Sequence, residues 1–594
     1  MEDALKQKRK VSLAIGETIV NGFAAVRRSV VARKAEVVCG TLLLVMAANL
    51  LVSISRKSIT NDEIVHIPAG YYHLVAGDFQ LNNEHPPLVK MWAALPLLLV
   101  QPEEPAPPTS EAENFMQRTW GFHERFWQAN ETRFQAVTFW PRAMMVPITL
   151  ALGLLIFVFT RRLFGDTAAM IAVGMYTLEP TVLAHGRIVH TDVPSALVYL
   201  LFFFALRRYH EAPGLKRAVT LGIVCALALL TKFSMLIIVP VLGVYLLGRL
   251  FINWRAARRR SGVLVHGGLM AFLILLLVNA AYYFKHPVLE ASDVRWVQLK
   301  SPAIFAFVTT TVRVLSKIIP TYYLFGVYNI ELHNHYGHAT SLLGQYNDLG
   351  WWYYFPVAFA LKTTIPFLLI AVVALAWTAW RLAKRDSRFV WIAVPVAVYL
   401  AISLTSHINI GVRHFLPVFP FLFIAGGALL AKLLRAQRAV GIAVLFVVFG
   451  FMGFEAARTF PDYTPYMNQL ASAHPHWYYL SDSNVEWGDD VNALAAYLKV
   501  RNETRVSAAL AGGWSTLSRY GVDYVDMVAI PPDQTPETRY VAIGAAFLNG
   551  SIIPGDENVV GRRSFERTNL FARYRNRKPE AVFGNSIYLF REHE

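Results

Sequence analysis

A series of apolar runs constrains this sequence most, because each run of about 20 residues is long enough to cross a bilayer as a helix. The runs lie near residues 37–55, 141–160, 167–184, 193–206, 217–231, 234–252, 263–284, 355–380, 389–405, 415–433 and 439–457. Hydrophobic residues make up 55% of the 594 residues, against about 45–50% in soluble domains. The sequence therefore predicts a polytopic α-helical membrane protein with about eleven transmembrane helices.

The basic residues indicate on which side of the membrane each connection lies. With a cytosolic N-terminus, every second connection is short and basic: residues 1–36, 161–162, 207–217, 255–260, 381–388 and 432–438. This positive-inside pattern predicts a cytosolic N-terminus and an extracytoplasmic C-terminus. The net charge of +16 is then assigned to cytosolic loops and does not indicate a nucleic-acid partner.

This topology divides the chain into three parts. Residues 1–36 form a cytosolic basic N-terminus, residues 37–457 a transmembrane domain with outer loops at 56–140 and 285–354, and residues 458–594 an extracytoplasmic domain. The last part contains strand-like runs at 504–511, 539–546 and 585–591 and a helical run near 488–500. These patterns predict a small C-terminal α/β domain.

Two acidic residues follow the first apolar run. In Thr60-Asn61-Asp62-Glu63, Thr60 and Glu63 have the spacing of a capping box, which predicts that a helix begins here and gives Glu63 a possible structural role. The cap does not require Asp62. At the positive end of a helix dipole the Asp62 carboxylate would stay ionised, as a general base requires.

The same loop returns to the membrane at Glu84-His85-Pro86-Pro87-Leu88-Val89-Lys90. The double proline favours an extended turn and brings a histidine and a lysine to the membrane surface. A solvated loop followed by a lysine that extends toward the interface is the structural alternative.

Three short motifs in this loop together resemble the first loop of known enzymes. The motifs are Asp62-Glu63, Gly77-Asp78-Phe79 and His85-Pro86-Pro87-Leu88-Val89-Lys90. In this order they resemble the protein O-mannosyltransferases and the related lipid A aminoarabinose transferases, which are GT-C type glycosyltransferases that take a sugar from a polyprenyl phosphate. The resemblance covers roughly residues 37–460. It implies a GT-C type catalytic domain with Asp62 as the catalytic aspartate and Glu63 beside it.

The aminoarabinose enzymes favour Glu-Lys-Pro-Pro where this chain has Glu84-His85-Pro86-Pro87. The loop therefore resembles the mannosyltransferases more closely, and a mannose-like hexose is the expected sugar.

Further ionisable groups occur in the other connections that are predicted to lie outside. They are Arg187, His190, Asp192, Lys232, Lys362, Arg413 and His414. Asp192 has the alternatives of capping a helix or pairing with a neighbouring arginine. The lysines and Arg413 have the alternative of contacting lipid headgroups. The resemblance implies that Lys232 contacts the carrier phosphate.

Three histidines in the second outer loop raise the question of a metal site. His333, His335 and His338 have a spacing that could hold zinc, but no cysteine or HExxH pattern supports it. Structural or substrate contacts are therefore predicted for His338, and neither a metal nor a cofactor is expected.

These residues suggest a mechanism for sugar transfer. The candidate cations for stabilising charge on the leaving phosphate are Lys90, Arg187, Lys232, Lys362 and Arg413. Asp62 would orient and deprotonate the acceptor hydroxyl, with Glu63 and Asp192 shaping the site. Further candidates for substrate binding are Glu84, His85, His190, His338 and His414. The resemblance implies inversion at the anomeric carbon by direct displacement.

Two other functions fit parts of the same layout. A transporter or lipid flippase predicts polar residues at mid-depth, where most of these runs carry no charge. A non-catalytic binding module would act through the tail, whose run 481–489 is polar and aromatic. For a glycosyltransferase the expected partners are the bilayer, a polyprenyl-phosphate sugar and a protein, lipid or glycan acceptor, at a prokaryotic inner membrane.

Overall fold

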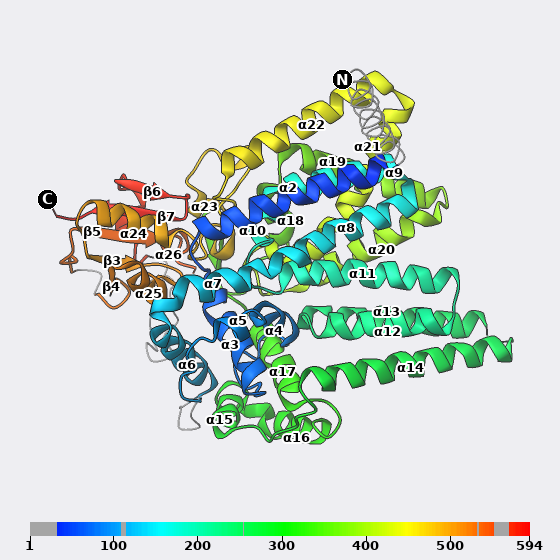
Figure 1. The fold of residues 1–594 in the computed structure, drawn as a ribbon, viewed down its shortest axis with the longest axis horizontal. Helices are drawn as coiled ribbons and strands as arrows, with labels where there is room; N and C mark the ends of the chain where they lie inside the picture. The colour runs from blue at the N-terminus through cyan, green and yellow to red at the C-terminus, as the bar shows by residue number, and fades with distance from the viewer. Residues whose placement is uncertain (1–32, 108–113, 254, 531–533, 552–568, 594) are drawn as a thin grey trace, which may run out of the picture.

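The computed structural model describes residues 33–107, 114–253, 255–530, 534–551 and 569–593. Most of the predicted cytosolic segment 1–36 lies outside the described residues. The described chain consists of a helical bundle and a smaller domain that contains a sheet (Figure 1).

The bundle is built from helices of different lengths whose axes lie roughly along one line (Figure 1). In chain order they are α2 (Lys34–Arg56), α7 (Phe134–Ala143), α8 (Met145–Phe164), α9 (Asp166–Leu178), α10 (Pro180–His185), α11 (Asp192–Glu211), α12 (Leu215–Leu229), α13 (Ile238–Ile252), α14 (Ala257–Ala281), α19 (Ile365–Ala383), α20 (Val390–Thr405), α21 (Phe419–Ala436) and α22 (Arg438–Thr459).

Within the described residues, eight helical segments are long and apolar enough to span a membrane. The other three expected spans coincide with α9, α11 and α12. Helices α9 and α12 have only 13 and 15 residues, and α9 packs against α8 and α21 within the bundle. The structure thus confirms a polytopic helical membrane protein, while the number of eleven spans stays a prediction.

The basic connections gather at one end of the bundle, which we call the basic end. There Arg161 Nη1 lies 2.6 Å from Glu36 Oε1, and Arg388 donates to the Leu163 carbonyl oxygen at 3.4 Å. At the opposite end, which we call the loop end, lie the two long loops and the C-terminal domain (Figure 1). The basic connections and the predicted site thus lie at opposite ends of the bundle.

The first long loop folds into short helices: α3 (Asn61–Val75), α4 (Leu88–Ala94), α5 (Leu97–Val100) and α6 (Phe115–Ala129). A Cβ atom at Gly70 of α3 would lie 2.2 Å from the Lys90 carbonyl oxygen, so only glycine permits this close approach of α3 and α4. The approach fixes the Glu84–Lys90 segment against the helix that carries Asp62.

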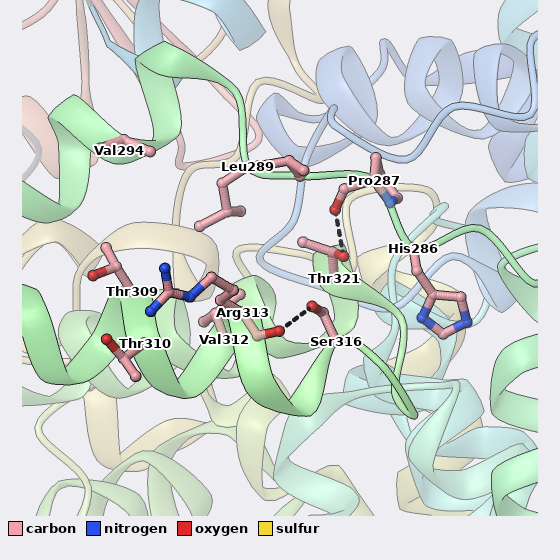
Figure 2. A pocket seen from close by; sticks show the side chains of 11 residues that line it. His286, Pro287, Leu289, Val294, Thr309, Thr310, Val312, Arg313, Ser316 and Thr321 are labelled. Atoms are coloured by element: carbon pink, nitrogen blue, oxygen red, sulfur yellow. Dashed lines mark hydrogen bonds between the residues drawn. The ribbon is translucent and has the colours of Figure 1, made fainter.

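The second long loop contains α15 (Ala291–Lys300), α16 (Phe305–Leu315), α17 (Thr321–Tyr336), the hairpin β1 (Thr340–Leu342) and β2 (Gln345–Asn347), and α18 (Tyr354–Lys362). A cavity of about 350 Å³ lies among α15, α16 and the start of α17. Figure 2 shows Arg313 and Thr310 on the side of α16 that faces it. No predicted site residue lines this cavity.

The C-terminal domain contains a five-stranded sheet of order β4-β3-β5-β7-β6. Its strands are β3 (Arg505–Ala509), β4 (Asp523–Asp526), β5 (Tyr540–Gly544), β6 (Ala581–Phe583) and β7 (Ile587–Arg591), and α24 (Val491–Val500) precedes them. The strands β4, β3 and β5 are parallel, whereas β7 pairs antiparallel with β5 and β6. The predicted α/β architecture is confirmed, and the exact domain limits stay predictions.

Candidate active site

Asp62 lies in the first turn of α3, where the predicted capping interaction is present. The Thr60 amide donates to Glu63 Oε2 at 2.8 Å. The two neighbouring acids have different environments, because the side chain of Asp62 is 22% exposed and that of Glu63 is fully buried. Only Asp62 is therefore accessible to a substrate.

Glu63 is occupied by structural contacts on both oxygens. Besides the cap, its Oε1 accepts from the Val189 amide at 2.9 Å and lies 3.3 Å from Arg142 Nε. These contacts join the start of α3 to the turn before α11 and to α7. The placement gives Glu63 a structural role, and its part in the catalytic site stays a prediction.

Four charged side chains form an alternating line at the loop end of the bundle. Arg413 Nη1 lies 2.5 Å from Asp62 Oδ2 and 3.6 Å from Asp192 Oδ2, and Lys232 Nζ forms an ion pair with Asp192 Oδ1. The order Asp62, Arg413, Asp192, Lys232 joins α3, the 3₁₀ helix η5 (Val412–Val418), α11 and the turn before η2 (Phe233–Ile237). Four residues predicted from separate segments are thus brought into one site.

Asp62 is held in its ionised form. Burial opposes ionisation, but the Arg413 guanidinium outweighs it and lowers the pKa of Asp62 below its usual value. The indole N–H of Trp487 donates to Asp62 Oδ1 at 3.2 Å and stabilises the same form. Asp62 is therefore ionised at neutral pH, as a group that orients an acceptor hydroxyl requires.

His190 packs beside Asp192. Its Nδ1 lies 2.8 Å from the Asp192 amide nitrogen and 3.1 Å from Asp192 Oδ2, and its Nε2 lies 3.1 Å from the His185 carbonyl oxygen. This histidine supports the turn that positions Asp192.

Other predicted residues surround the charged line. Burial, with a smaller effect from the positive charge of Lys232, lowers the pKa of His85 well below its usual value. Burial, with a smaller effect from the positive charge of Arg413, lowers the pKa of His338 to about 4. The many protein atoms around Glu84 raise its pKa, and the negative charge of Asp62 adds a smaller increase. The side chain of Glu84 is nevertheless in contact with solvent. The pKa values of His85, His338 and Glu84 thus respond to charges of the line. His414 directly follows Arg413 and is half-buried.

Two of the predicted phosphate contacts are lysines that fix loops. Lys90 Nζ donates to the Asn82 carbonyl oxygen at 2.6 Å and to the His85 carbonyl oxygen at 2.9 Å, and burial lowers its pKa to about 7. Lys362 Nζ donates to the carbonyl oxygens of Thr464 and Asn484, both at 2.6 Å. These contacts show that both lysines fix loops, and their contact with the donor phosphate stays a prediction.

Arg187 is also committed to a structural contact. Its Nη2 donates to Asp489 Oδ2 at 2.8 Å, and both side chains are fully buried. The partner belongs to the segment that follows α22, so the pair ties the bundle to the C-terminal domain. Of the five predicted phosphate cations, Lys232 and Arg413 are the two that lie in the charged line.

Sequence reasoning missed two residues of the site because both lie in the C-terminal part of the chain. Trp487 contacts Asp62, and Asp482 lies with its Oδ2 3.8 Å from His338 Nε2. Both belong to the polar and aromatic run 481–489, which the sequence offered only as an isolated binding surface. The density of acids around a tryptophan was the available signal.

The histidines of the second long loop do not form a metal site in the described part of the chain, where no group of three His, Cys, Asp or Glu side chains has that arrangement. His333 Nε2 lies 3.0 Å from His338 Nδ1, and the ring of His335 packs against Tyr336. The pair His333–His338 instead positions His338 beside the charged line.

One known protein family matches a segment in the first half of the chain. Residues 133–282 match the dolichyl-phosphate-mannose-protein mannosyltransferase family. This segment contains Asp192 and Lys232 of the charged line, whereas Asp62 and Arg413 lie outside it. The match confirms the predicted resemblance to protein mannosyltransferases over about a quarter of the chain, and it supports a membrane glycosyltransferase of the GT-C type. No curated protein matches the chain.

Two solved structures are similar at low sequence identity. The Archaeoglobus fulgidus oligosaccharyltransferase, in complex with Zn and sulfate, is 11% identical, with a TM-score of 0.45 and coverage of 86% of this chain and 68% of that one. ArnT from Cupriavidus metallidurans, bound to undecaprenyl phosphate, is 16% identical, with a TM-score of 0.42 and coverage of 81% and 74% respectively.

Proposed function

We propose that this protein is an inverting glycosyltransferase that moves a mannose-like hexose from a polyprenyl phosphate to an acceptor hydroxyl. The observation that carries the proposal is the alternating line of Asp62, Arg413, Asp192 and Lys232 at the loop end of the bundle. We place this end on the extracytoplasmic side because the basic connections gather at the other end. The membrane we propose is a prokaryotic inner membrane.

The donor phosphate would bind to Lys232 and Arg413. Both cations are buried, and both face Asp192, so their positions are fixed before a substrate arrives. A phosphate is a good leaving group when preorganised cations stabilise the charge that develops on it.

An apolar groove lies where the lipid chain of such a donor would extend. It has a volume of about 640 Å³ and is lined by side chains of α11, α13 and α20, among them Phe203, Val241 and Val394. Its lining reaches Ile237, the last residue of the 3₁₀ helix that begins directly after Lys232. The rest of the lining extends from there to His210 and Ser387 at the basic end, so the groove would hold the lipid chain along the bundle.

Asp62 would act on the acceptor. Its carboxylate orients the acceptor hydroxyl and takes the proton as the hydroxyl oxygen bonds to the anomeric carbon. The bond between that carbon and the phosphate oxygen breaks at the same time, and the electron pair leaves with the phosphate. One displacement inverts the anomeric centre, and no covalent intermediate on the protein is required.

The test is sugar transfer by the full chain in proteoliposomes, with a polyprenyl-phosphate hexose as donor and an extract of membrane acceptors. Asp62→Asn removes the base without changing the size of the side chain, so transfer is expected to fall about 10²–10⁴-fold. Undiminished transfer by folded Asp62→Asn protein would show that the base is misassigned. Movement of the lipid across the bilayer without a covalent product would instead favour the transporter or flippase alternative.

A further inference from the structure

We propose that the C-terminal domain supplies part of the active site, and that Trp487 is a positioning residue for Asp62 and Arg413. The inference rests on the proposed glycosyl transfer. It assigns a catalytic task to a domain that lies entirely outside the segment matched by the mannosyltransferase family.

Trp487 contacts both the catalytic carboxylate and the cation that pairs with it. Its indole N–H donates to Asp62 Oδ1 at 3.2 Å, while Arg413 holds the other oxygen at 2.5 Å. The Arg413 guanidinium carbon lies 4.2 Å from the centre of the indole ring. One side chain from the C-terminal domain therefore contacts both members of the central ion pair.

The contacts of Trp487 restrict how Asp62 is oriented. With a different donor on each oxygen, the carboxylate is held in one orientation by two charge-assisted hydrogen bonds. The indole face also attracts the guanidinium through a cation–π interaction. Loss of the N–H would leave Asp62 held by Arg413 on one oxygen alone, so the carboxylate would be oriented less strictly toward the acceptor position.

The backbone around Trp487 is joined to the backbone that leads to Asp62. The Asn61 amide donates to the Trp487 carbonyl oxygen at 2.8 Å, and the Ser58 amide donates to the Asp489 carbonyl oxygen at 3.0 Å. Gly488 between them has a φ of +97°, and a Cβ there would lie 2.6 Å from the Ala511 carbonyl oxygen. The tail thus runs alongside residues 58–61, immediately before Asp62.

Two buried ion pairs hold the segment directly after Trp487. Asp489 pairs with Arg187, and the next residue, Asp490, pairs with Lys57, which lies at the end of α2. Each partner comes from the bundle, and each side chain is at least nine-tenths buried. A surface module that only docks on the membrane domain would not need fully buried charges at its contact.

Simple docking predicts that any large apolar ring at position 487 is sufficient. Positioning predicts that the N–H itself matters. Trp487→Phe retains an aromatic face against Arg413 and removes the donor. Incorporation of 3-benzothienylalanine at position 487 is the closer replacement, because it keeps the size of the bicyclic ring and lacks only the N–H.

The experiment measures kcat, the donor KM and the pH dependence of kcat for the full chain in proteoliposomes. For both replacements we expect kcat to fall about tenfold, with little change in the donor KM. The acid limb of the kcat profile should move to higher pH, because Asp62 loses a donor that favours its ionised form. Trp514→Phe, at a half-exposed tryptophan of the same domain, is the matched control and should behave as wild type.

The outcomes separate this inference from the proposed function. If the wild-type chain transfers no sugar, the proposed function fails and position 487 is not the reason. If the wild type is active and the benzothienyl variant retains its kcat and its pH profile, the positioning role of Trp487 is overturned. Thermal unfolding of each variant shows whether Trp487→Phe is folded, and the isosteric replacement decides the question where it is not.

Discussion

Arg413 is the most informative residue to change, because its guanidinium lies between the two carboxylates of the site. Its Nη1 is 2.5 Å from Asp62 Oδ2 and 3.6 Å from Asp192 Oδ2, and its side chain is only 6% exposed. Arg413→Lys keeps the positive charge but loses the planar fork, whereas Arg413→Gln loses the charge as well. The two variants therefore separate charge from geometry.

The expected magnitudes follow from these contacts. Removal of one preorganised donor that faces developing charge costs about 2.7–4 kcal/mol of transition-state stabilisation, or about 10²–10³-fold in kcat, and we expect this loss for Arg413→Gln. Arg413→Lys should lose about tenfold, because an ammonium cannot contact both carboxylates equally well. The glutamine variant also leaves Asp62 without its cation, whereas Asp192 keeps Lys232, so we expect folding stability to fall as well.

The assay is the pH dependence of sugar transfer in proteoliposomes, normalised to the amount of folded protein from thermal unfolding. In Arg413→Gln, burial of Asp62 is no longer opposed, so its pKa rises and the acid limb of the profile moves to higher pH. Lys232→Gln is the matched control, because Lys232 pairs with Asp192 and not with Asp62. If Arg413→Gln and Lys232→Gln gave the same acid limb as wild type, the assignment of Arg413 to Asp62 would be refuted.

Two further predictions concern Asp482 and the apolar groove. Burial raises the pKa of Asp482 from 3.8 to about 6, so its stabilising contribution is present below pH 4 and is lost as the pH rises through 6. Asp482→Asn should therefore raise the unfolding temperature at pH 8 by a few degrees (~2–3 kcal/mol) and have little effect near pH 4. Equal effects at both pH values would contradict this account. Val241→Trp and Val394→Trp should raise the KM for a long-chain donor and spare a short-chain analogue. Val447→Trp, at an exposed position on α22, is the control for the groove, and equal effects on both donors would exclude the groove as the lipid site.

The fold was predictable where its signal is local. Apolar runs of about 20 residues specify spans because a bilayer demands that length from any helix that crosses it. The spans with the shorter helices lie inside the bundle, such as α9, which is covered by neighbouring helices. The strands of the C-terminal domain followed from alternating and apolar patterns, but β4 and β6 have only four and three residues and were too short to detect.

The site was predictable only in part, because its pairings join residues that are far apart in the sequence. The position of Asp62 followed from a local helix start and an ordered set of motifs. The partners of Arg187 and Asp62 are Asp489 and Trp487, which lie 302 and 425 residues away. A buried cation looks the same in a sequence whether it binds a substrate or a carboxylate, so Lys90, Arg187 and Lys362 could not be distinguished from Lys232.

The alternating order of charges also explains why proton transfer and phosphate departure would help each other. Before transfer, a phosphodiester donor carries one negative charge and Asp62 carries another. As the acceptor loses its proton to Asp62, that carboxylate becomes neutral, and the leaving phosphate gains the charge that Asp62 has lost. The net charge of the site is unchanged, while negative charge moves from one side of Arg413 to the other. Once Asp62 is neutral it no longer attracts Arg413, and at the same moment the leaving phosphate gains negative charge. The ion pair with Asp62 therefore holds the Arg413 guanidinium in position to stabilise the transition state.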